Sequence, residues 1–156
     1  MILQVDVQNA SAETVPAADE IRGWIAATLA EVGRQQDTEI TVRLVDSAEM
    51  SQLNRAYRGK PGPTNVLSFA ADLPPRFALP LLGDIVICAP LVHREAGEQC
   101  KSPAAHWAHM TIHGTLHLLG YDHTEEEQAS TMEALESSIL NHLEYPCPYT
   151  GASAQP

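Results

Sequence analysis

The chain carries the sequence HGTLHLLGYDH at residues 113–123, which spaces three histidines at positions i, i+4 and i+10. On a helix, His113 and His117 lie one turn apart on the same face, close enough to hold one ion. Gly120 favours the left-handed conformation that ends a helix, so the chain can turn back and bring His123 to the same ion. Three imidazole nitrogens that leave a fourth position for water are typical of a catalytic zinc site. The stretch therefore predicts a helix that ends at Gly120 and carries a metal site.

One position separates this stretch from the metzincin pattern of zinc proteases, H-E-x-x-H-x-x-G-x-x-H, because Gly114 replaces the glutamate. In those proteases the glutamate takes a proton from zinc-bound water and passes it to the leaving amine. Gly114 has no side chain for this step, which weakens the case for a peptidase. RNA is a better substrate, because its 2′-hydroxyl or a metal-activated water can attack the phosphorus. A nearby arginine can then offset the charge of the transition state.

Arg58 is the predicted arginine, since a guanidinium can engage two phosphate oxygens at once. It belongs to a local basic cluster: Arg55, Arg58 and Lys60 make up a third of the 9 lysines and arginines in the chain. The net charge of −11 argues against a broad surface that coats nucleic acid, so contact with phosphate must be local.

The remaining histidines receive separate interpretations. His109 lies one turn before His113, where it could contact a bound phosphate or orient a water; alternatively it is a polar residue that lines a wet cleft. We expect His106 to be exposed, and His93 and His142 to have structural roles. Asp122 could accept a hydrogen bond from an imidazole or cap the following helix. The imidazole set favours one zinc ion but also tolerates nickel or cobalt.

The composition predicts one domain over residues 1–149 and a flexible tail over residues 150–156. The N-terminus lacks the basic and apolar pattern of a signal peptide, and no apolar run approaches transmembrane length. Three cysteines at unrelated spacings suggest reduced thiols in a cytoplasmic protein, with neither disulfides nor a thiolate zinc site.

Hydrophobic periodicity predicts an α+β fold in which a single mixed sheet of about four strands is packed by helices. Helix-start signals include Asp46 with Glu49 and Thr124 with Glu127, each pair being spaced as a capping box. Residues 71–82 are expected to form a surface loop. The expected strands are residues 2–7, 40–44, 65–70 and 83–89, and the expected helices are residues 16–33, 50–57, 90–100 and 103–120 and a last one from residue 124.

The chain resembles the YbeY family of bacterial endoribonucleases, also called ribosomal-RNA maturation factors. The likeness is carried by residues 53–60 (LNRAYRGK) with 63–69 (PTNVLSF), by residues 82–87 (LGDIVI), and by the histidine stretch from His109 to His123. One departure is Asn65, where the family commonly has aspartate.

The resemblance implies a zinc-dependent endoribonuclease that prefers single-stranded RNA. It would act in 3′-end maturation of small-subunit ribosomal RNA and in ribosome quality control. Its implied partners are ribosomal RNA and the small ribosomal subunit with its assembly factors, with no membrane. By position, His113, His117 and His123 would bind the metal, and Arg58 would be needed for activity.

Two other functions stay open at this point. One is a zinc peptidase or amide hydrolase whose base comes from elsewhere in the chain. The other is a ribosome-assembly factor whose metal is mainly structural. The endoribonuclease predicts RNA cleavage that a chelator and Arg58→Ala both abolish, whereas the peptidase predicts peptide cleavage that is indifferent to Arg58.

Overall fold

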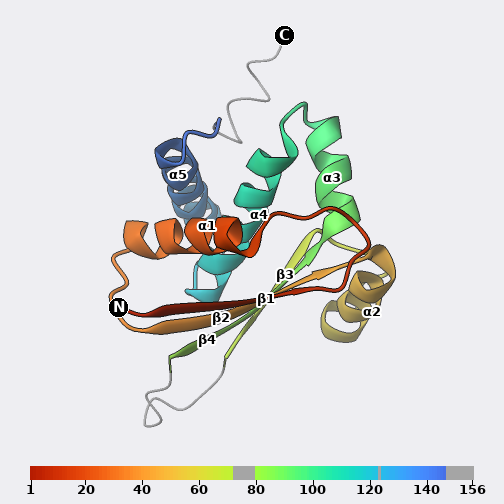
Figure 1. Ribbon diagram of the computed structural model, residues 1–156, viewed down its shortest axis with the longest axis horizontal. Helices are drawn as coiled ribbons and strands as arrows, with labels where there is room; N and C mark the ends of the chain where they lie inside the picture. The colour runs from red at the N-terminus through yellow and green to blue at the C-terminus, as the bar shows by residue number, and fades with distance from the viewer. Residues whose placement is uncertain (72–79, 123, 147–156) are drawn as a thin grey trace.

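The computed structural model of the chain describes residues 1–71, 80–122 and 124–146, which form four strands and five helices. Figure 1 shows their arrangement. The strands are β1 (Leu3–Asn9), β2 (Thr38–Val45), β3 (Val66–Ala70) and β4 (Leu81–Cys88), and the helices are α1 (Ala18–Glu31), α2 (Ser47–Arg58), α3 (Ala89–Glu98), α4 (Pro103–Leu118) and α5 (Glu126–His142).

The strands form one sheet in the order β1-β2-β4-β3. β1, β2 and β4 run parallel, whereas β3 pairs antiparallel with β4. The predicted α+β class with a mixed sheet of about four strands is therefore confirmed. β3 lies at one edge of the sheet, and its residues line the groove that is described below.

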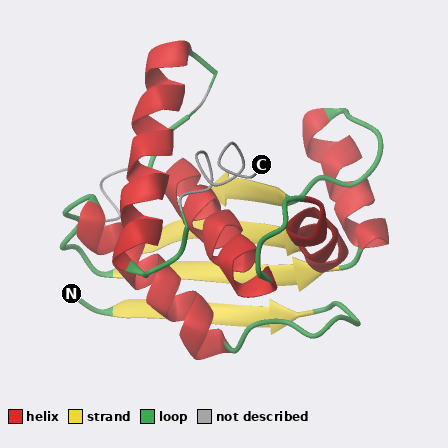
Figure 2. Cartoon of the chain, turned by 90° about the horizontal axis from the view of Figure 1, so that it is seen from above, coloured by secondary structure: helices red, strands yellow, loops and turns green. Residues whose placement is uncertain are grey.

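Helices pack on both faces of the sheet, because alternate residues of a strand point to opposite sides. On one face, Ile85 and Ile87 of β4 join the apolar side chains of α1, α4 and α5 in the larger core. On the other face, Val86 and Cys88 pack with Met50 of α2 in a smaller core. Figure 2 shows helices lying across the sheet.

α4 is the central helix of the larger layer, and it packs against α1, α3, α5, β3 and β4. Its N-terminus is capped by Ser102, whose side chain accepts a hydrogen bond from the amide of Ala105 at 3.1 Å. It ends at Leu118, and Gly120 adopts a φ of 100°. The predicted helix end at this glycine is confirmed.

The two predicted capping boxes are wrong. Asp46 occupies the N-cap position of α2, but its carboxylate accepts the amide of Ala12 at 3.1 Å, while Glu49 pairs with Arg43. α5 begins at Glu126, so its N-cap position falls to Glu125 and not to Thr124. The carboxylate of Asp46 therefore binds an amide that is distant in sequence, and it makes no hydrogen bond to the first turn of α2.

Three further expectations fall partly outside the described residues. Residues 72–79 of the predicted loop and the tail after residue 149 are not described, so the proposed domain boundary stays a prediction. Cys88 is buried and Cys100 is exposed, both as free thiols, and Cys147 lies outside the described part. Among the described helices, none has the length and apolar character needed to span a bilayer.

Candidate functional site

The site is built on a pair of histidines on one face of α4. Nε2 of His113 and Nε2 of His117 lie 3.1 Å apart, as expected for residues one helical turn apart. Both side chains line a groove of about 650 Å³. His123 lies outside the described residues, but its neighbours Asp122 and Thr124 line the same groove. Within the described residues, no group of three histidine, cysteine or carboxylate side chains is arranged so that it could hold a metal ion.

A buried glutamate of α5, which was not among the predicted site residues, orients His113 of this pair. Oε2 of Glu136 lies 2.5 Å from Nδ1 of His113, and its Oε1 lies 3.3 Å from Nε2 of His109. The residue is fully buried. A signal was present in the sequence: Glu136 stands four residues after Met132 and four before Leu140, in the middle of the apolar stripe of α5.

Glu136 remains ionised despite its burial. Burial by itself raises the pKa of this carboxyl, but hydrogen bonds and charge interactions with His109 and His113 outweigh it and lower the pKa to about 2. A carboxylate at this position makes Nδ1 of His113 the hydrogen-bond donor and Nε2 the acceptor that faces Nε2 of His117. His109 faces this carboxylate, and its predicted contact with phosphate stays a prediction.

The prediction that His106 is exposed is wrong, since its side chain is only 2% exposed. Its Nε2 lies 2.8 Å from Oε1 of Glu95 on α3. Burial lowers the pKa of His106 to about 4, against the opposing effect of the hydrogen bond with Glu95. The prediction failed because the sequence did not show that Glu95 of α3 packs against this part of α4.

Arg58 lines the same groove from another helix. It is the last residue of α2, and it lines the groove with β3 and the two histidines. Its Nη1 donates to Oδ1 of Asn54 at 3.4 Å, while the amide of this buried asparagine donates to the carbonyl of Gly62 at 2.9 Å. Asn54 thereby ties Arg58 to the loop that follows α2.

Asn65 also lines the groove. Its side-chain nitrogen donates to both carboxylate oxygens of Glu95, at 3.2 and 3.4 Å. Glu95 in turn holds His106, so one carboxylate links the start of β3 to α4. An aspartate at residue 65 would instead face this carboxylate with the same charge.

The structure explains the glycine at position 114. A Cβ built there would lie 2.8 Å from Cγ2 of Ile85 and 3.2 Å from Oγ of Ser68. The hydroxyl of Ser68 also donates to the carbonyl of Gly114 at 2.9 Å. α4 therefore packs closely against β3 and β4 here, and a glutamate at this position would have to enter the sheet.

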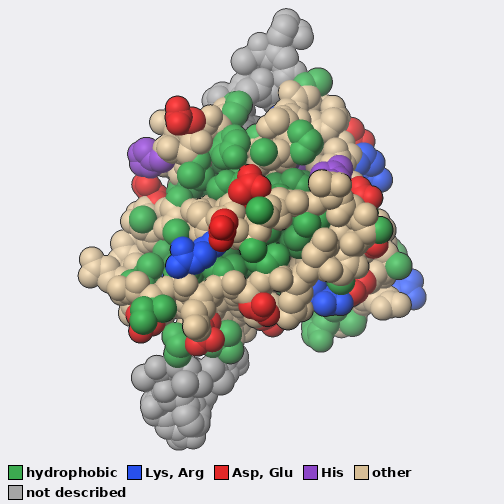
Figure 3. Space-filling model, in the orientation of Figure 1, with side chains coloured by type: hydrophobic (Ala, Val, Ile, Leu, Met, Phe, Trp, Pro, Cys, Tyr) green, Lys and Arg blue, Asp and Glu red, His purple; other side chains and the backbone are tan. Residues whose placement is uncertain are grey.

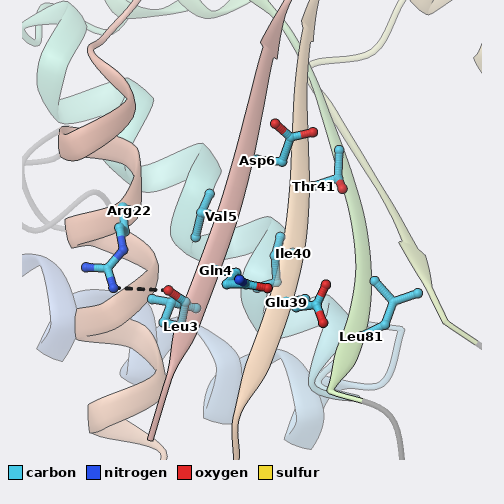
Figure 4. A pocket seen from close by; sticks show the side chains of 9 residues that line it. All are labelled: Leu3, Gln4, Val5, Asp6, Arg22, Glu39, Ile40, Thr41 and Leu81. Carbon is cyan, nitrogen blue, oxygen red and sulfur yellow. Dashed lines mark hydrogen bonds between the residues drawn. The ribbon is translucent and has the colours of Figure 1, made fainter.

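Asp122 lines the groove three residues before the N-cap of α5, so it does not cap that helix. A second hollow of about 490 Å³ is lined by residues of β1 and β2 with Arg22 of α1 and Leu81 of β4. Figure 4 shows Asp6 and Glu39 there and the hydrogen bond from Arg22 to the carbonyl of Leu3, which measures 3.0 Å. None of the predicted site residues that the structure describes lines this hollow.

Charge on the surface agrees with a local rather than a broad basic region. On the face drawn in Figure 3, the described acidic side chains are scattered and the basic ones form no wide patch. The cluster of Arg55, Arg58 and Lys60 is exposed at the C-terminal end of α2, beside the groove.

Comparison with known proteins shows the family of the chain. Three curated proteins called "Endoribonuclease YbeY" are similar to the chain: those of Cellvibrio japonicus (50% identical, covering 96% of this chain and 85% of the relative), Stutzerimonas stutzeri (50%, 99% and 96%) and Pseudomonas putida (52%, 95% and 94%). A solution structure from Thermotoga maritima shares the fold, with a TM-score of 0.59, 22% identity and 92% coverage of each chain. The family model described as "Endoribonuclease YbeY" matches residues 4–144, and the chain therefore belongs to the YbeY family.

Proposed function

We propose that the chain is a metal-dependent endoribonuclease that cleaves single-stranded RNA in the groove between α4 and β3. The observation that carries the proposal is the shared groove, which is lined by Arg58 and by a histidine pair whose His113 is oriented by Glu136. The names of its relatives support the reaction type.

The donor set fits a divalent transition metal, with zinc as the first choice. Two nitrogens bound to one zinc at about 2.0–2.1 Å in a tetrahedral site lie about 3.3 Å apart, and the observed separation is 3.1 Å. His113, His117 and His123 would hold the ion, and Glu136 would fix the tautomer of His113. When bound, such an ion supplies Lewis acidity toward a phosphate oxygen and toward water.

The binding of the substrate phosphate and the stabilisation of its transition state would depend on the side chains around the groove. Arg58 would bind the nonbridging phosphate oxygens and offset the charge that grows on them in the transition state. Asn54 would keep its guanidinium at the rim of the groove. The close packing of Gly114 supports a nuclease over a metzincin-like peptidase, because the position of the protease's general base has no room for a side chain.

The cellular role we infer is 3′-end maturation of small-subunit ribosomal RNA and ribosome quality control in the cytoplasm. The partners would be ribosomal RNA and the small ribosomal subunit with its assembly factors. This part of the proposal rests on the family resemblance. Mapping of ribosomal RNA 3′ ends in cells that express only the Arg58→Ala variant would test it, with accumulation of unprocessed ends as the expected result.

The biochemical proposal is tested with wild-type protein, Arg58→Ala and the neighbouring control Arg55→Ala. Each is incubated with single-stranded RNA and with a peptide pool, while bound metal is measured. We expect RNA cleavage that a chelator abolishes, that Arg58→Ala reduces by at least about 100-fold and that Arg55→Ala largely retains. Peptide cleavage without RNA cleavage would overturn the proposal.

A further inference from the structure

Tyr57 is an exposed aromatic residue at the rim of the groove. Of the described large hydrophobic side chains, Met1, Ile2, Tyr57 and Leu81 are exposed, and Tyr57 is the only aromatic one, at 67% exposure. It directly precedes Arg58 at the end of α2, and both side chains line the groove together with the two histidines.

The ring of Tyr57 is held in place from one side. It makes an edge-to-face contact with Phe69 of β3, with 5.0 Å between ring centroids and 66° between the planes. Phe69 packs against the smaller core, so it connects the exposed ring to a fixed part of the fold. The arrangement keeps the ring at the groove while most of its surface stays in water.

An exposed ring beside cations is typical of proteins that bind single strands, in which bases stack on aromatic faces while basic residues follow the phosphates. Arg55, Arg58 and Lys60 surround Tyr57 in sequence and are all exposed. The base and the phosphate of one nucleotide are covalently joined, so a ring and a guanidinium on consecutive residues can engage both.

We propose that Tyr57, supported by Phe69, is a stacking platform for one base of a single-stranded RNA whose phosphate Arg58 binds. This inference deepens the proposed function and rests on it. It assigns Tyr57 to substrate binding, outside the reacting atoms. It also supplies a physical reason for a preference for single strands, because a paired and stacked base cannot offer its face to the ring.

The test compares wild-type protein with Tyr57→Phe, which keeps the ring, and Tyr57→Leu, which keeps apolar volume without a π face. Cleavage kinetics are measured on one single-stranded RNA and on copies in which a single abasic nucleotide is moved along the strand. Stacking of one base contributes about 1–3 kcal/mol, which corresponds to about 5- to 150-fold in binding. Thermal unfolding and metal content show whether each variant is folded and loaded.

We expect one abasic position to raise KM by this factor in wild-type protein and in Tyr57→Phe, with kcat little changed. Tyr57→Leu should raise KM on the intact RNA by a similar factor and lose its sensitivity to that abasic position. If wild-type protein cleaves RNA but Tyr57→Leu retains both its KM and its abasic sensitivity, the platform is wrong and the proposed function stands. Wild-type protein that neither binds nor cleaves RNA overturns both.

A spectroscopic variant gives a second measurement should Tyr57→Leu fail to fold. Tyr57→Trp adds an exposed indole to a chain whose own Trp24 and Trp107 are buried. Fluorescence that is quenched by intact RNA and not by fully abasic RNA supports stacking. Equal quenching by both, or by neither, overturns it.

Discussion

Nδ1 of His113 on α4 lies 2.5 Å from Oε2 of Glu136 on α5, so the orientation of a predicted metal ligand is set by a helix that follows it in sequence. Partners of this kind fix the tautomer of a ligating imidazole and increase its basicity. Because Glu136 is fully buried and ionised, it adds a negative charge close to the ion that the histidines would hold.

Glu136→Gln should therefore weaken zinc binding by about 10- to 100-fold while the fold is retained, since the variant loses the charge and keeps the shape. Competition with a chelator of known affinity measures the effect. Glu133→Gln on the exposed face of the same helix is the matched control and should bind as wild type does. Equal zinc affinity in both variants would show that the contact has no effect on the metal.

Asn54→Ala should lower kcat/KM for RNA by about 10- to 100-fold, because a misplaced catalytic group loses activity steeply with distance. The structural reason is that Asn54 connects Arg58 to the carbonyl of Gly62. If Asn54 acts through Arg58, the double variant with Arg58→Ala is no slower than Arg58→Ala alone. Losses that simply multiply would assign Asn54 an independent role.

Gly114→Ala should destabilise the protein by about 1–3 kcal/mol through overpacking, since the added Cβ would lie 2.8 Å from Ile85. Gly23→Ala in α1 is the control, because a Cβ there meets nothing within 4 Å. It should gain about 0.5–1 kcal/mol from the better helix propensity of alanine. Urea unfolding of both variants measures the difference, and similar stabilities would contradict the close packing of α4 on the sheet.

Stability should fall in acid because of His106. Its pKa is about 4 in the folded protein against an ordinary value of 6.5, so the unfolded chain binds the proton first as the pH falls. The contribution is complete above pH 6.5 and is lost between about pH 6.5 and 4, on the order of 3 kcal/mol in all. Urea unfolding of metal-free wild type and His106→Gln at several pH values measures it; equal pH slopes would refute the assignment.

Asn65→Asp should destabilise the protein by about 1–3 kcal/mol near neutral pH, because a second carboxylate would face Glu95 at hydrogen-bond distance. Glu95→Gln in the same chain should restore most of the loss by removing the like charge. Thermal unfolding of the two variants checks this. An aspartate variant as stable as wild type would mean that the side chain turns away from Glu95.

Local sequence determined the parts of the site that lie within one helix. His113 and His117 share a face because the helical period requires it, and the helix ends near Gly120 because glycine tolerates a positive φ. An alternating apolar pattern likewise predicted the strands at residues 2–7 and 40–44, because a strand with one buried face has a period of two, and apolar runs predicted the other two strands. Such features depend on residues that are close together in the chain, so they can be predicted directly from the sequence.

Tertiary packing decided the other contacts of the site. It brings together residues that are far apart in the sequence, and their separation in sequence does not predict their distance in space. It set Glu136 behind His113, brought Arg58 and Tyr57 to the groove, and buried His106 under α3. It also places the carboxylate of Asp46 where it accepts a hydrogen bond from the amide of Ala12, in place of the predicted capping bond to α2. A side chain takes whichever partner the assembled fold offers it, and that choice is made only when distant helices and strands pack.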